Sequence, residues 1–403
     1  MRLWPKSPLS SSAARWTTPP EAEHHGLLRE TVRRFVETEV PRELARKWDR
    51  ENEIDRGVLY KLADLGLFGI TIPEHYGGSG RDITATMIVI EELCRRSTAL
   101  GSGYIYGACY AGMNLVDTAS EAQRQEWLPK VARGEMLFSY GLTEPDVGSD
   151  LASVATTAVR DGEVVRINGA KRFCSGTTYT DYIYALVNSN PDGERYHNLS
   201  FVLIPPRHPG VTIEPQHAMG LKGSMTTDVT FNDVEVPAHN IVGGDEGWNQ
   251  GWTKLAGPGL DVEKIEVAAM ALGIATGAVE DAWAYAQERV QFGKPISSHQ
   301  SIRHMLSEGR TRLLASRLLT YHAARLLDEE KPASVETSMA KLFVCDTAKD
   351  IVLSMQQVMG AYGYVEDFDM ERYVRDVLVM PIIGGSSAIQ RNNISNRLKL
   401  AKE

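Results

Sequence analysis

The chain has 403 residues, of which 43% are hydrophobic and 24% are charged, so it is long enough for two or three globular domains with a sizeable core. Its formal net charge of −9 argues against non-specific binding to nucleic acid or to anionic membranes, which both require a basic surface. The four cysteines are far apart, no HExxH string occurs and no apolar run reaches the length of a membrane span. The sequence therefore predicts no metal site and no transmembrane helix, and it favours a reducing compartment.

Residues 1–20 are predicted to form a flexible N-terminal arm. They carry Arg2, Lys6 and Arg15, several serines and no acidic residue. A mitochondrial transit peptide has a similar composition, which would place the mature protein in the mitochondrial matrix. We favour an arm and a cytoplasmic protein, because the basic residues are few and the stretch is short.

Residues 21–135 are predicted to form an N-terminal all-α domain. Apolar residues recur at helical spacing in Leu27–Val36 and again in Leu59–Leu67. A further helix is expected at Met87–Cys94. The small residues of Ala99–Gly112 predict a tightly packed helix.

Residues 136–245 change to a β pattern. They contain strand-length runs rich in Val, Ile, Thr and Phe, at Val164–Ile167, Tyr182–Val187, Leu199–Ile204 and Asp228–Phe231. Turn dipeptides separate these runs, which is typical of antiparallel strands. We expect a middle domain that resembles an antiparallel β-barrel.

Residues 246–403 return to long helical patterns and are predicted to form a C-terminal four-helix bundle. The expected helices are Ile265–Gln291, His299–Leu327, Val335–Met359 and Gly385–Leu400. Gly273 and Gly277 share one face of the first helix, where small residues let a neighbouring helix approach closely. The fold class is therefore α+β, with the order α, β, α along the chain.

Tyr140–Asp150 is the string that indicates a binding site most directly. Pro145 and Gly148 prevent a continuous helix or central strand, so the string must form a shaped loop. Such a loop directs backbone N–H groups and the hydroxyls of Thr143 and Ser149 at a phosphate or a polar ligand edge.

Three further strings carry candidate binding residues. In Lys171–Gly176, strand alternation would place Phe173 and Ser175 on one side, to cover a flat ring and hydrogen-bond its edge. Arg289–Gln300 forms a corner between helices, where Arg289 offers a fork suited to a phosphate. Gln357–Gly363 is a Gly-rich helix end. Each string taken alone is equally consistent with an ordinary strand, a solvated helix turn or a helix cap.

These strings, together with Gly384–Gln390, occur in the order and at about the spacing seen in acyl-CoA dehydrogenases, and the chain resembles that family from about residue 22 to 400. The resemblance implies FAD as the cofactor and an acyl-CoA thioester as the substrate. It also implies an electron-transferring flavoprotein as electron acceptor and a homo-oligomer, usually a tetramer built as a dimer of dimers.

The resemblance assigns residues to FAD in two groups that meet across neighbouring subunits. The group expected at the flavin ring and pyrophosphate consists of Tyr140, Leu142, Thr143, Gly148, Ser149, Phe173, Ser175 and Ser386. The group expected at the adenine dinucleotide part consists of Arg289, Gln291, Phe292, Ile296, His299, Gln300, Gln357, Gly360 and Ala361. The expected substrate contacts are Ser149, Asp261, Lys264 and Gly385.

The general base departs from the commonest family pattern. Many members carry a Glu just before the C-terminal Gly-Thr/Ser motif, and Gly384 stands there in this chain. A smaller branch, similar to isovaleryl- and long-chain-type dehydrogenases, carries the Glu on another helix, where this chain has Glu263. Glu263 shares a helical face with Val267, Met270 and Ile274, so burial should raise its pKa as a base requires; the alternative is a helix N-terminal carboxylate that the dipole favours. The resemblance implies that the Gly384 N–H holds the thioester carbonyl, and Lys264 replaces the usual Arg beside the base.

Other activities remain open. The same strings resemble crotonobetainyl-CoA reductase, so the enzyme is alternatively an enoyl-CoA reductase, or a dehydrogenase of a carrier-protein-bound acyl group. Retention of Glu263 argues against a flavin monooxygenase, and the intact flavin contacts argue against a catalytically silent subunit. We expect the acyl cavity to be lined from Glu92–Cys109 and Leu255–Lys264, where Tyr104, Tyr106 and Tyr110 favour a polar, branched or cyclic acyl group.

Overall fold

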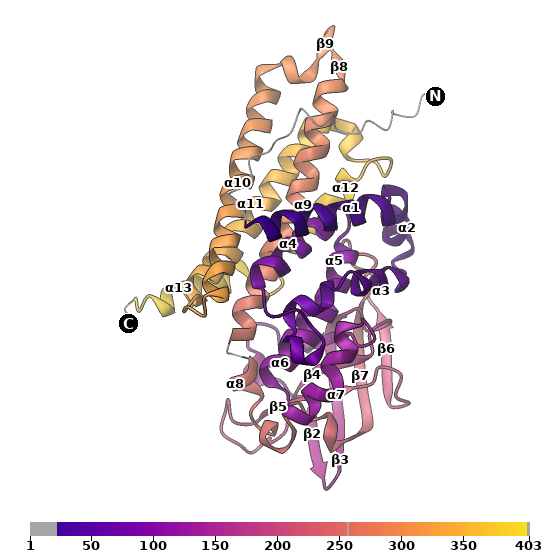
Figure 1. Cartoon of the computed structure of the whole chain (residues 1–403), viewed down its shortest axis with the longest axis vertical. Helices are drawn as coiled ribbons and strands as arrows, with labels where there is room; N and C mark the ends of the chain where they lie inside the picture. The colour runs from indigo at the N-terminus through magenta and orange to yellow at the C-terminus, as the bar shows by residue number, and fades with distance from the viewer. Residues whose placement is uncertain (1–21, 256–257, 401–403) are drawn as a thin grey trace.

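The computed structural model describes residues 22–255 and 258–400, and the predicted arm at 1–20 lies outside them. Helices at both ends of the chain lie together at one end of the molecule, and the sheet forms the other end (Figure 1). The α+β prediction is confirmed. Within the described ranges, no helix is long and apolar enough to cross a membrane.

The N-terminal part is helical, as predicted. Its elements are α1 (Glu23–Glu39), α2 (Arg42–Glu51), α3 (Gly57–Asp64), α4 (Ile83–Cys94), α5 (Thr98–Ile105), η3 (Tyr106–Met113), α6 (Asn114–Thr118) and α7 (Glu121–Ala132). Every residue of α4 is buried, so this helix forms the centre of the domain. A capping box formed by Ser120 and Gln123 starts α7 and satisfies N–H groups that would otherwise lack partners.

The run of small residues predicted as one helix continues from α5 through η3 into α6. The η3 stretch is π-helical, a geometry that is rare and frequently marks functional sites. Gly107 needs to be a glycine, because a Cβ there would lie 2.7 Å from the Phe68 ring. Cys109 and Met113 of η3 face the first turns of the C-terminal helix that begins at Pro258.

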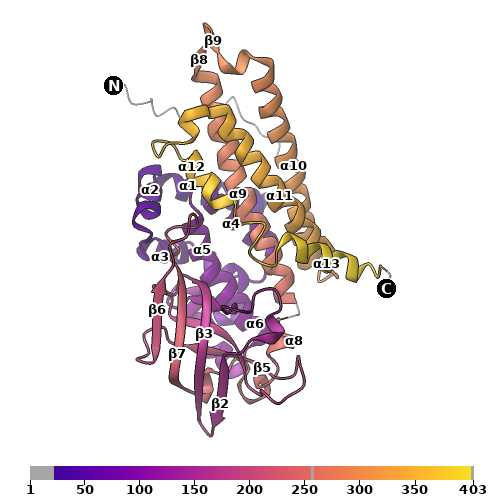
Figure 2. The ribbon, with the colours of Figure 1, turned by 180° about the vertical axis from the view of Figure 1, so that it is seen from behind.

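The middle part is one curled seven-stranded sheet (Figure 2). Its strands are β1 (Phe138–Gly141), β2 (Thr157–Asp161), β3 (Val164–Ser175), β4 (Tyr182–Asn188), β5 (Leu199–Ile204), β6 (Val211–Pro215) and β7 (Thr226–Pro237), and their order is β1-β4-β2-β3-β7-β6, with β5 on β4. Most pairs are antiparallel, as predicted. The prediction is wrong for β4, which pairs in parallel with β1 and β2 because long connections, not hairpins, separate these strands.

The C-terminal part contains three long helices and several short elements. These are α8 (Gly251–Leu255), α9 (Pro258–Glu288), α10 (Gln300–Asp328), α11 (Ser334–Met359), α12 (Met370–Val377) and α13 (Ser387–Arg397), with the hairpin β8 (Val290–Gln291) and β9 (Lys294–Pro295) after α9. The close approach predicted at Gly273 and Gly277 is confirmed. A Cβ on either residue would lie within 2.6 Å of a carbonyl oxygen of Glu91 or Arg95 at the end of α4.

The two helical parts share one hydrophobic core, which runs from α1 and α4 into α9, α10 and α11. A buried charge cluster joins them as well. Arg29 donates to Glu91 and Glu92 at 2.9 Å, and Arg317 of α10 pairs with Glu91. The core therefore fixes α9 against the N-terminal helices, and this contact creates the cavity described next.

Candidate active site

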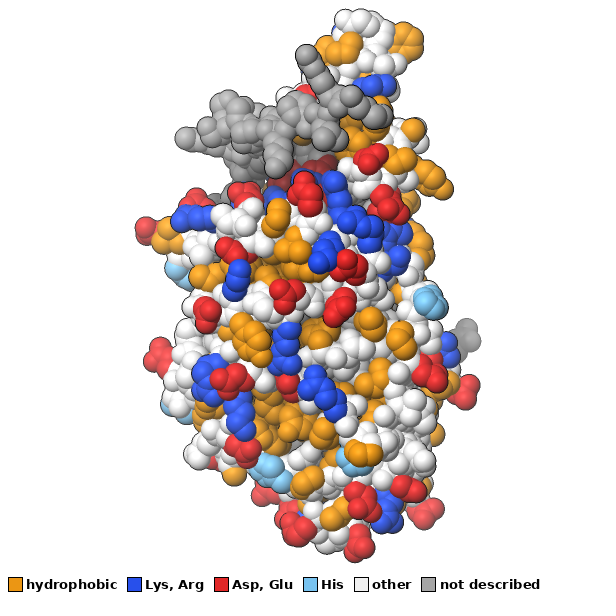
Figure 3. Space-filling view, turned by 90° about the vertical axis from the view of Figure 1, so that its right-hand side faces the viewer, with side chains coloured by type: hydrophobic (Ala, Val, Ile, Leu, Met, Phe, Trp, Pro, Cys, Tyr) orange, Lys and Arg blue, Asp and Glu red, His pale blue; other side chains and the backbone are white. Residues whose placement is uncertain are grey.

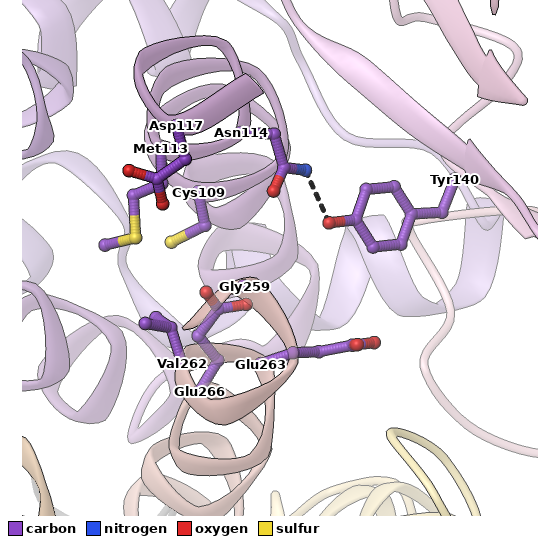
Figure 4. Close-up of a pocket in the computed structure, with 9 residues that line it drawn as sticks. All are labelled: Cys109, Met113, Asn114, Asp117, Tyr140, Gly259, Val262, Glu263 and Glu266. Carbon is purple, nitrogen blue, oxygen red and sulfur yellow. Dashed lines mark hydrogen bonds between the residues drawn. The ribbon is translucent and has the colours of Figure 1, made fainter. Parts of the chain in front are cut away.

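A small cavity lies where η3 and α6 face the first turns of α9 (Figure 4). Its volume is about 10 Å³, which is room for about one water molecule. Its walls are Cys109, Met113, Asn114, Asp117, Tyr140, Gly259, Val262, Glu263 and Glu266. The cavity includes residues of the predicted stretch Leu255–Lys264. On the opposite wall, the predicted stretch Glu92–Cys109 contributes only its last residue, and Tyr104 lies in the core, stacked on Phe68.

Glu263 extends from α9 toward the side of the cavity where Tyr140 lies (Figure 4). Burial raises the pKa of this carboxyl to about 7, although the positive charges of Lys264 and Lys341 oppose the shift. Its carboxylate has no hydrogen bond or ion pair within residues 22–255 and 258–400. The predicted rise in the pKa is confirmed, and a carboxyl that titrates near neutral pH can accept a proton efficiently.

Glu266 is a second carboxyl that the sequence reasoning missed. It lies one turn after Glu263, is 4% exposed and points toward Cys109 (Figure 4). Burial and the charge of Glu263 raise the pKa of Glu266 to about 8, and a hydrogen bond from the Cys109 thiol lowers it. The available signal was a second acid three residues after the first, on a helix that is otherwise apolar in this stretch.

Tyr140 connects the cavity to the sheet. Asn114 donates from Nδ2 to the Tyr140 hydroxyl at 2.6 Å, and the Tyr140 ring stacks on Tyr110 with centroids 3.5 Å apart. Burial and then the charge of Glu263 raise the pKa of Tyr140. Tyr140, predicted as a cofactor contact, therefore also borders the cavity beside Glu263.

Gly384 lies against the helix that carries Glu263. A Cβ on Gly384 would lie 2.8 Å from a methyl group of Val267, and its φ of 60° is left-handed, so both space and backbone favour glycine. Gln390 donates to the carbonyls of Gly384 and Gly385 at 3.1 and 2.9 Å. The Gly384 N–H donates to no acceptor in the described part of the chain.

Lys341 of α11 lies between the segment before Gly384 and Glu263. It is fully buried, donates from Nζ to the Met380 carbonyl at 3.0 Å and is close enough to lower the pKa of Glu263. Ser386 caps α13, where its hydroxyl accepts from the Ile389 N–H at 3.4 Å. The segment 380–386 is therefore fixed at one end by the Lys341–Met380 hydrogen bond and at the other by the Ser386 cap of α13.

Asp261 and Lys264 form an ion pair, and Asp261 also accepts a hydrogen bond from the start of α11. Lys264 donates from Nζ to Asp261 at 2.7 Å, and Ser334 donates to the other Asp261 oxygen at 2.5 Å. In this conformation both charged groups have protein partners. Their predicted contact with substrate stays a prediction.

The loop Tyr140–Asp150 is shaped from beneath by a buried ion pair. Lys171 of β3 has no exposed side-chain surface and donates to Glu144 at 2.7 Å and to the Leu142 carbonyl at 3.2 Å. Glu144 also accepts the N–H groups of Ala155 and Thr156. Its backbone pairs with Val147, which closes the turn and leaves Gly148 and Ser149 on the surface.

Phe173 departs from the alternation assumed for β3. The pairing with β7 shifts between Lys171 and Cys174, and Phe173 has a φ of 60° and is 59% exposed. The Arg172 guanidinium lies 5.1 Å from its ring centre. Ser175 hydrogen-bonds Thr226 across to β7 at 3.1 Å. The bulge holds an aromatic ring out beside the loop, a placement that fits the covering of a flat ligand and that simple alternation does not explain.

The second predicted group lies at the far tip of the molecule, around the β8–β9 hairpin (Figures 1 and 3). The Arg289 guanidinium lies 5.4 Å from the ring centre of Tyr362, beside the turn η8 (Gly360–Gly363). Phe292, at the hairpin turn, is 93% exposed and contacts His299 edge-on. The tip also includes Gln291, exposed Gln300 and Gln357, buried Ile296, and Gly360 and Ala361.

The two groups do not meet within one chain. Arg289 directly follows the helix that carries Glu263 and lies 26 residues after it, which corresponds to about 39 Å at 1.5 Å per residue. At one end, the exposed Ser149 hydroxyl, the exposed Phe173 ring and the open backbone of Gly148 suit a flavin. A guanidinium, exposed Gln side chains and Gly360, around which a Cβ would meet nothing, suit a nucleotide at the other.

The chain thus combines a helical, a sheet and a second helical part, with the carboxyls of Glu263 and Glu266 beside a cavity between the helical parts. Three family models match the chain: "Acyl-CoA dehydrogenase, N-terminal domain" at residues 22–135, the middle domain at 139–234 and the C-terminal domain at 249–399. The chain belongs to the acyl-CoA dehydrogenase family. It is therefore an FAD flavoprotein that acts on CH–CH bonds.

Individual relatives agree with the family assignment. An acyl-CoA dehydrogenase of Bacillus subtilis is 35% identical over 92% of this chain and 97% of its own length. The CarC subunit of the caffeyl-CoA reductase–Etf complex of Acetobacterium woodii is 35% identical over 94% and 98%. The structure of butyryl-CoA dehydrogenase from Megasphaera elsdenii superposes with a TM-score of 0.89 at 28% identity, over 95% of this chain and all of that one.

Proposed function

We propose that this protein oxidises an acyl-CoA thioester between its α and β carbons, with Glu263 as the base. The observation that carries the proposal is the isolated Glu263 carboxyl, which faces the cavity and has a pKa near 7. An ionised Glu263 removes the proton from the α carbon. Bound FAD supplies the acceptor for the hydride that leaves the β carbon.

The Gly384 N–H is proposed to bind the thioester carbonyl. Negative charge develops on this oxygen as the α proton leaves, and a fixed N–H donor stabilises it. Two features support the role: the N–H has no acceptor within the described ranges, and Gly384 packs on Val267, one turn from Glu263. We propose that Lys341 positions both the Gly384 segment and Glu263. It donates to the carbonyl of Met380, four residues before Gly384, and its positive charge lowers the pKa of Glu263.

We infer that FAD is completed by a second copy of the chain. Arg289 of the tip group lies at the far end of the molecule from the flavin-group residues on the sheet and its loop (Figure 1), so we infer that one chain does not supply both groups to one cofactor. The exposed Phe292 and Tyr364 at the tip are typical of a surface that a partner covers. A homotetramer follows from the family resemblance, and light scattering of the purified holoprotein measures it.

Reduction of an enoyl-CoA is the second candidate, because one relative is the CarC subunit of a caffeyl-CoA reductase–Etf complex. Glu263 would then deliver a proton to the α carbon. We propose an electron-transferring flavoprotein as redox partner in either direction. The four cysteines are buried and free, which supports a reducing compartment, and we propose the cytoplasm.

An anaerobic titration of the purified holoprotein separates the two directions. Saturated acyl-CoAs of graded length should bleach the visible flavin band if the protein is a dehydrogenase. After chemical reduction, enoyl-CoAs should restore the band if reduction is its reaction. A yellow protein that responds to neither class of thioester would refute the proposed function.

A further inference from the structure

Glu266 is the polar group of the cavity that the proposed reaction leaves without a role. It is 4% exposed and aimed into the cavity, and its one polar partner within the described residues is the Cys109 thiol. A thiol is a weak hydrogen-bond donor and carries no compensating charge. Buried acidic side chains normally have strong partners, so an acid left in this state points to a partner that arrives with the ligand.

The cavity offers no positive charge to Glu266. No Lys, Arg or His is among the cavity-lining residues of the described chain, whereas three carboxyls are. Asp117 is already paired with Arg81 at 2.7 Å. The nearest lysines serve other groups: Lys264 binds Asp261, and Lys341 binds the Met380 carbonyl. Both lysines lower the pKa of Glu263, and neither acts on Glu266.

A fully apolar acyl chain would make this arrangement costly. Such a chain would leave the buried Glu266 carboxyl with no polar partner other than the Cys109 thiol, and a buried polar group without a strong partner is destabilising. The pKa of Glu266, raised to about 8, has the same cause: no cation is near, so the buried carboxyl keeps its proton. A ligand cation would reverse that balance and release the proton to solvent.

We propose that Glu266 recognises an acyl chain that carries a protonated amine, so that the substrate is an aminoacyl thioester. This inference rests on the proposed function and assigns the substrate class of the same site. The amine would donate to the Glu266 carboxylate while the α carbon lies at Glu263. Glu263 and Glu266 lie three residues apart on α9, and their carboxyls point in different directions (Figure 4), so the test uses amines at two distances from the α carbon.

Two matched pairs of thioesters test this with the FAD-loaded enzyme: 5-aminopentanoyl-CoA against hexanoyl-CoA, and 6-aminohexanoyl-CoA against heptanoyl-CoA. Each pair differs by an ammonium group in place of a terminal methyl. A hydrogen bond between charged groups is worth roughly 1.5–3 kcal/mol, so kcat/KM for the better amine should exceed that of its partner by about 10- to 150-fold. Flavin bleaching under anaerobic conditions gives the rates.

Variants assign the preference to Glu266. Glu266→Gln should reduce the ratio of amine to methyl substrate to about 1, whereas Asp117→Asn should keep it, because Arg81 already neutralises Asp117. Calorimetric binding to Glu263→Gln, which slows turnover, should show the same preference in Kd. A ratio near or below 1 in the wild type, or one that survives in Glu266→Gln, would overturn the proposal.

The outcomes also separate this inference from the proposed function. If hexanoyl-CoA bleaches the flavin and neither amine does, the protein is a dehydrogenase and the aminoacyl assignment is wrong. If no thioester of either pair reacts, the aminoacyl assignment is equally wrong, and the wider titration decides the function. Rapid bleaching by an amine thioester, lost in Glu266→Gln while FAD stays bound, supports both.

Discussion

The two ends of α9 differ in how much of their surroundings a single chain supplies. At its N-terminal end, Glu263 borders a cavity walled by η3, α6, Tyr140 of the sheet and α9 itself, and the nearby Lys264 and Lys341 have partners in the same chain. At its C-terminal end, the hairpin carries Phe292 almost fully exposed, and Arg289 contacts the exposed ring of Tyr362. One helix thus connects the proposed proton-transfer site, whose side chains are packed within one chain, to a proposed binding surface that is largely exposed.

This difference fits two separate proposed roles, proton transfer at the buried end and cofactor binding at the tip. Proton transfer needs fixed geometry and a dry environment, and a single folded chain provides both. The proposed cofactor contacts at the tip need only a few exposed groups, which we propose a second copy covers on assembly. Changes at the buried end should therefore alter the chemistry, whereas changes at the tip should alter cofactor content and assembly.

Glu263→Gln is the change with the largest expected effect, and it acts at the buried end. The amide cannot accept the α proton but keeps the shape of the side chain. A positioned base contributes typically 10²–10⁴-fold, so turnover should fall by that factor while FAD stays bound. Glu288→Gln, at the exposed end of the same helix, is the control. Turnover within a few-fold of wild type in Glu263→Gln would show that another group is the base.

Lys171→Met tests whether the loop at the buried end depends on its ion pair. The change leaves Glu144 charged, buried and without its cation, and breaking a buried pair costs on the order of 3–5 kcal/mol. We expect a lower thermal midpoint and a smaller ratio of flavin to protein absorbance. Lys130→Met removes an exposed lysine from a surface pair with Glu126 and should change neither quantity. Full FAD content in Lys171→Met would contradict the supporting role.

Arg289→Ala probes the tip. Loss of a guanidinium that binds phosphate should weaken FAD by roughly 10- to 150-fold, from 1.5–3 kcal/mol for a charged hydrogen bond. Flavin content after dialysis and the mass from light scattering measure the effect, with exposed Arg207→Ala as the control. If Arg289→Ala keeps its FAD and its assembly, the tip is an ordinary helix turn and the comparison between the two ends fails.

The sequence predicted most of the fold because its signals were local. Helical periodicity located α1, α4 and the three long C-terminal helices, and β5 matches the expected Leu199–Ile204. Strand direction was not local: β4 pairs in parallel with β1 and β2 through connections that no short turn signal describes. The π-helical stretch η3 was also not predicted, because a run of small residues fits an α-helix equally well.

The site was predicted in part for the same reason. The resemblance to isovaleryl- and long-chain-type dehydrogenases pointed to Glu263, and the apolar face of its helix predicted its raised pKa. Glu266 was missed because its surroundings include Cys109 of a distant segment. Lys341 was missed because its contacts to Met380 and Glu263 join three segments. The role of Phe173 was inferred from alternation, but a bulge and a left-handed backbone place its ring.

The smallest expected effect is a pH dependence that reports on the buried end alone. Burial raises the pKa of Glu263 to about 7, so the free enzyme carries the ionised base above that pH and the protonated acid below it. For oxidation, kcat/KM should therefore fall about tenfold per pH unit below pH 7. For reduction, in which Glu263 must give up a proton, the fall should occur above pH 7 instead.

Lys341→Met sharpens this test, because Lys341 opposes the rise in the Glu263 pKa. Without that charge the pKa should rise further, so the acid limb of oxidation should move to higher pH. Lys331→Met removes an exposed lysine that pairs with Glu329 and should leave the limb in place. The other groups around Glu263 are Lys264, Glu266, Tyr110 and Tyr140, and the two tyrosines stay neutral because burial raises their pKa values. An acid limb near the ordinary carboxyl range, or one that Lys341→Met does not move, would mean that Glu263 is not the group that transfers the proton.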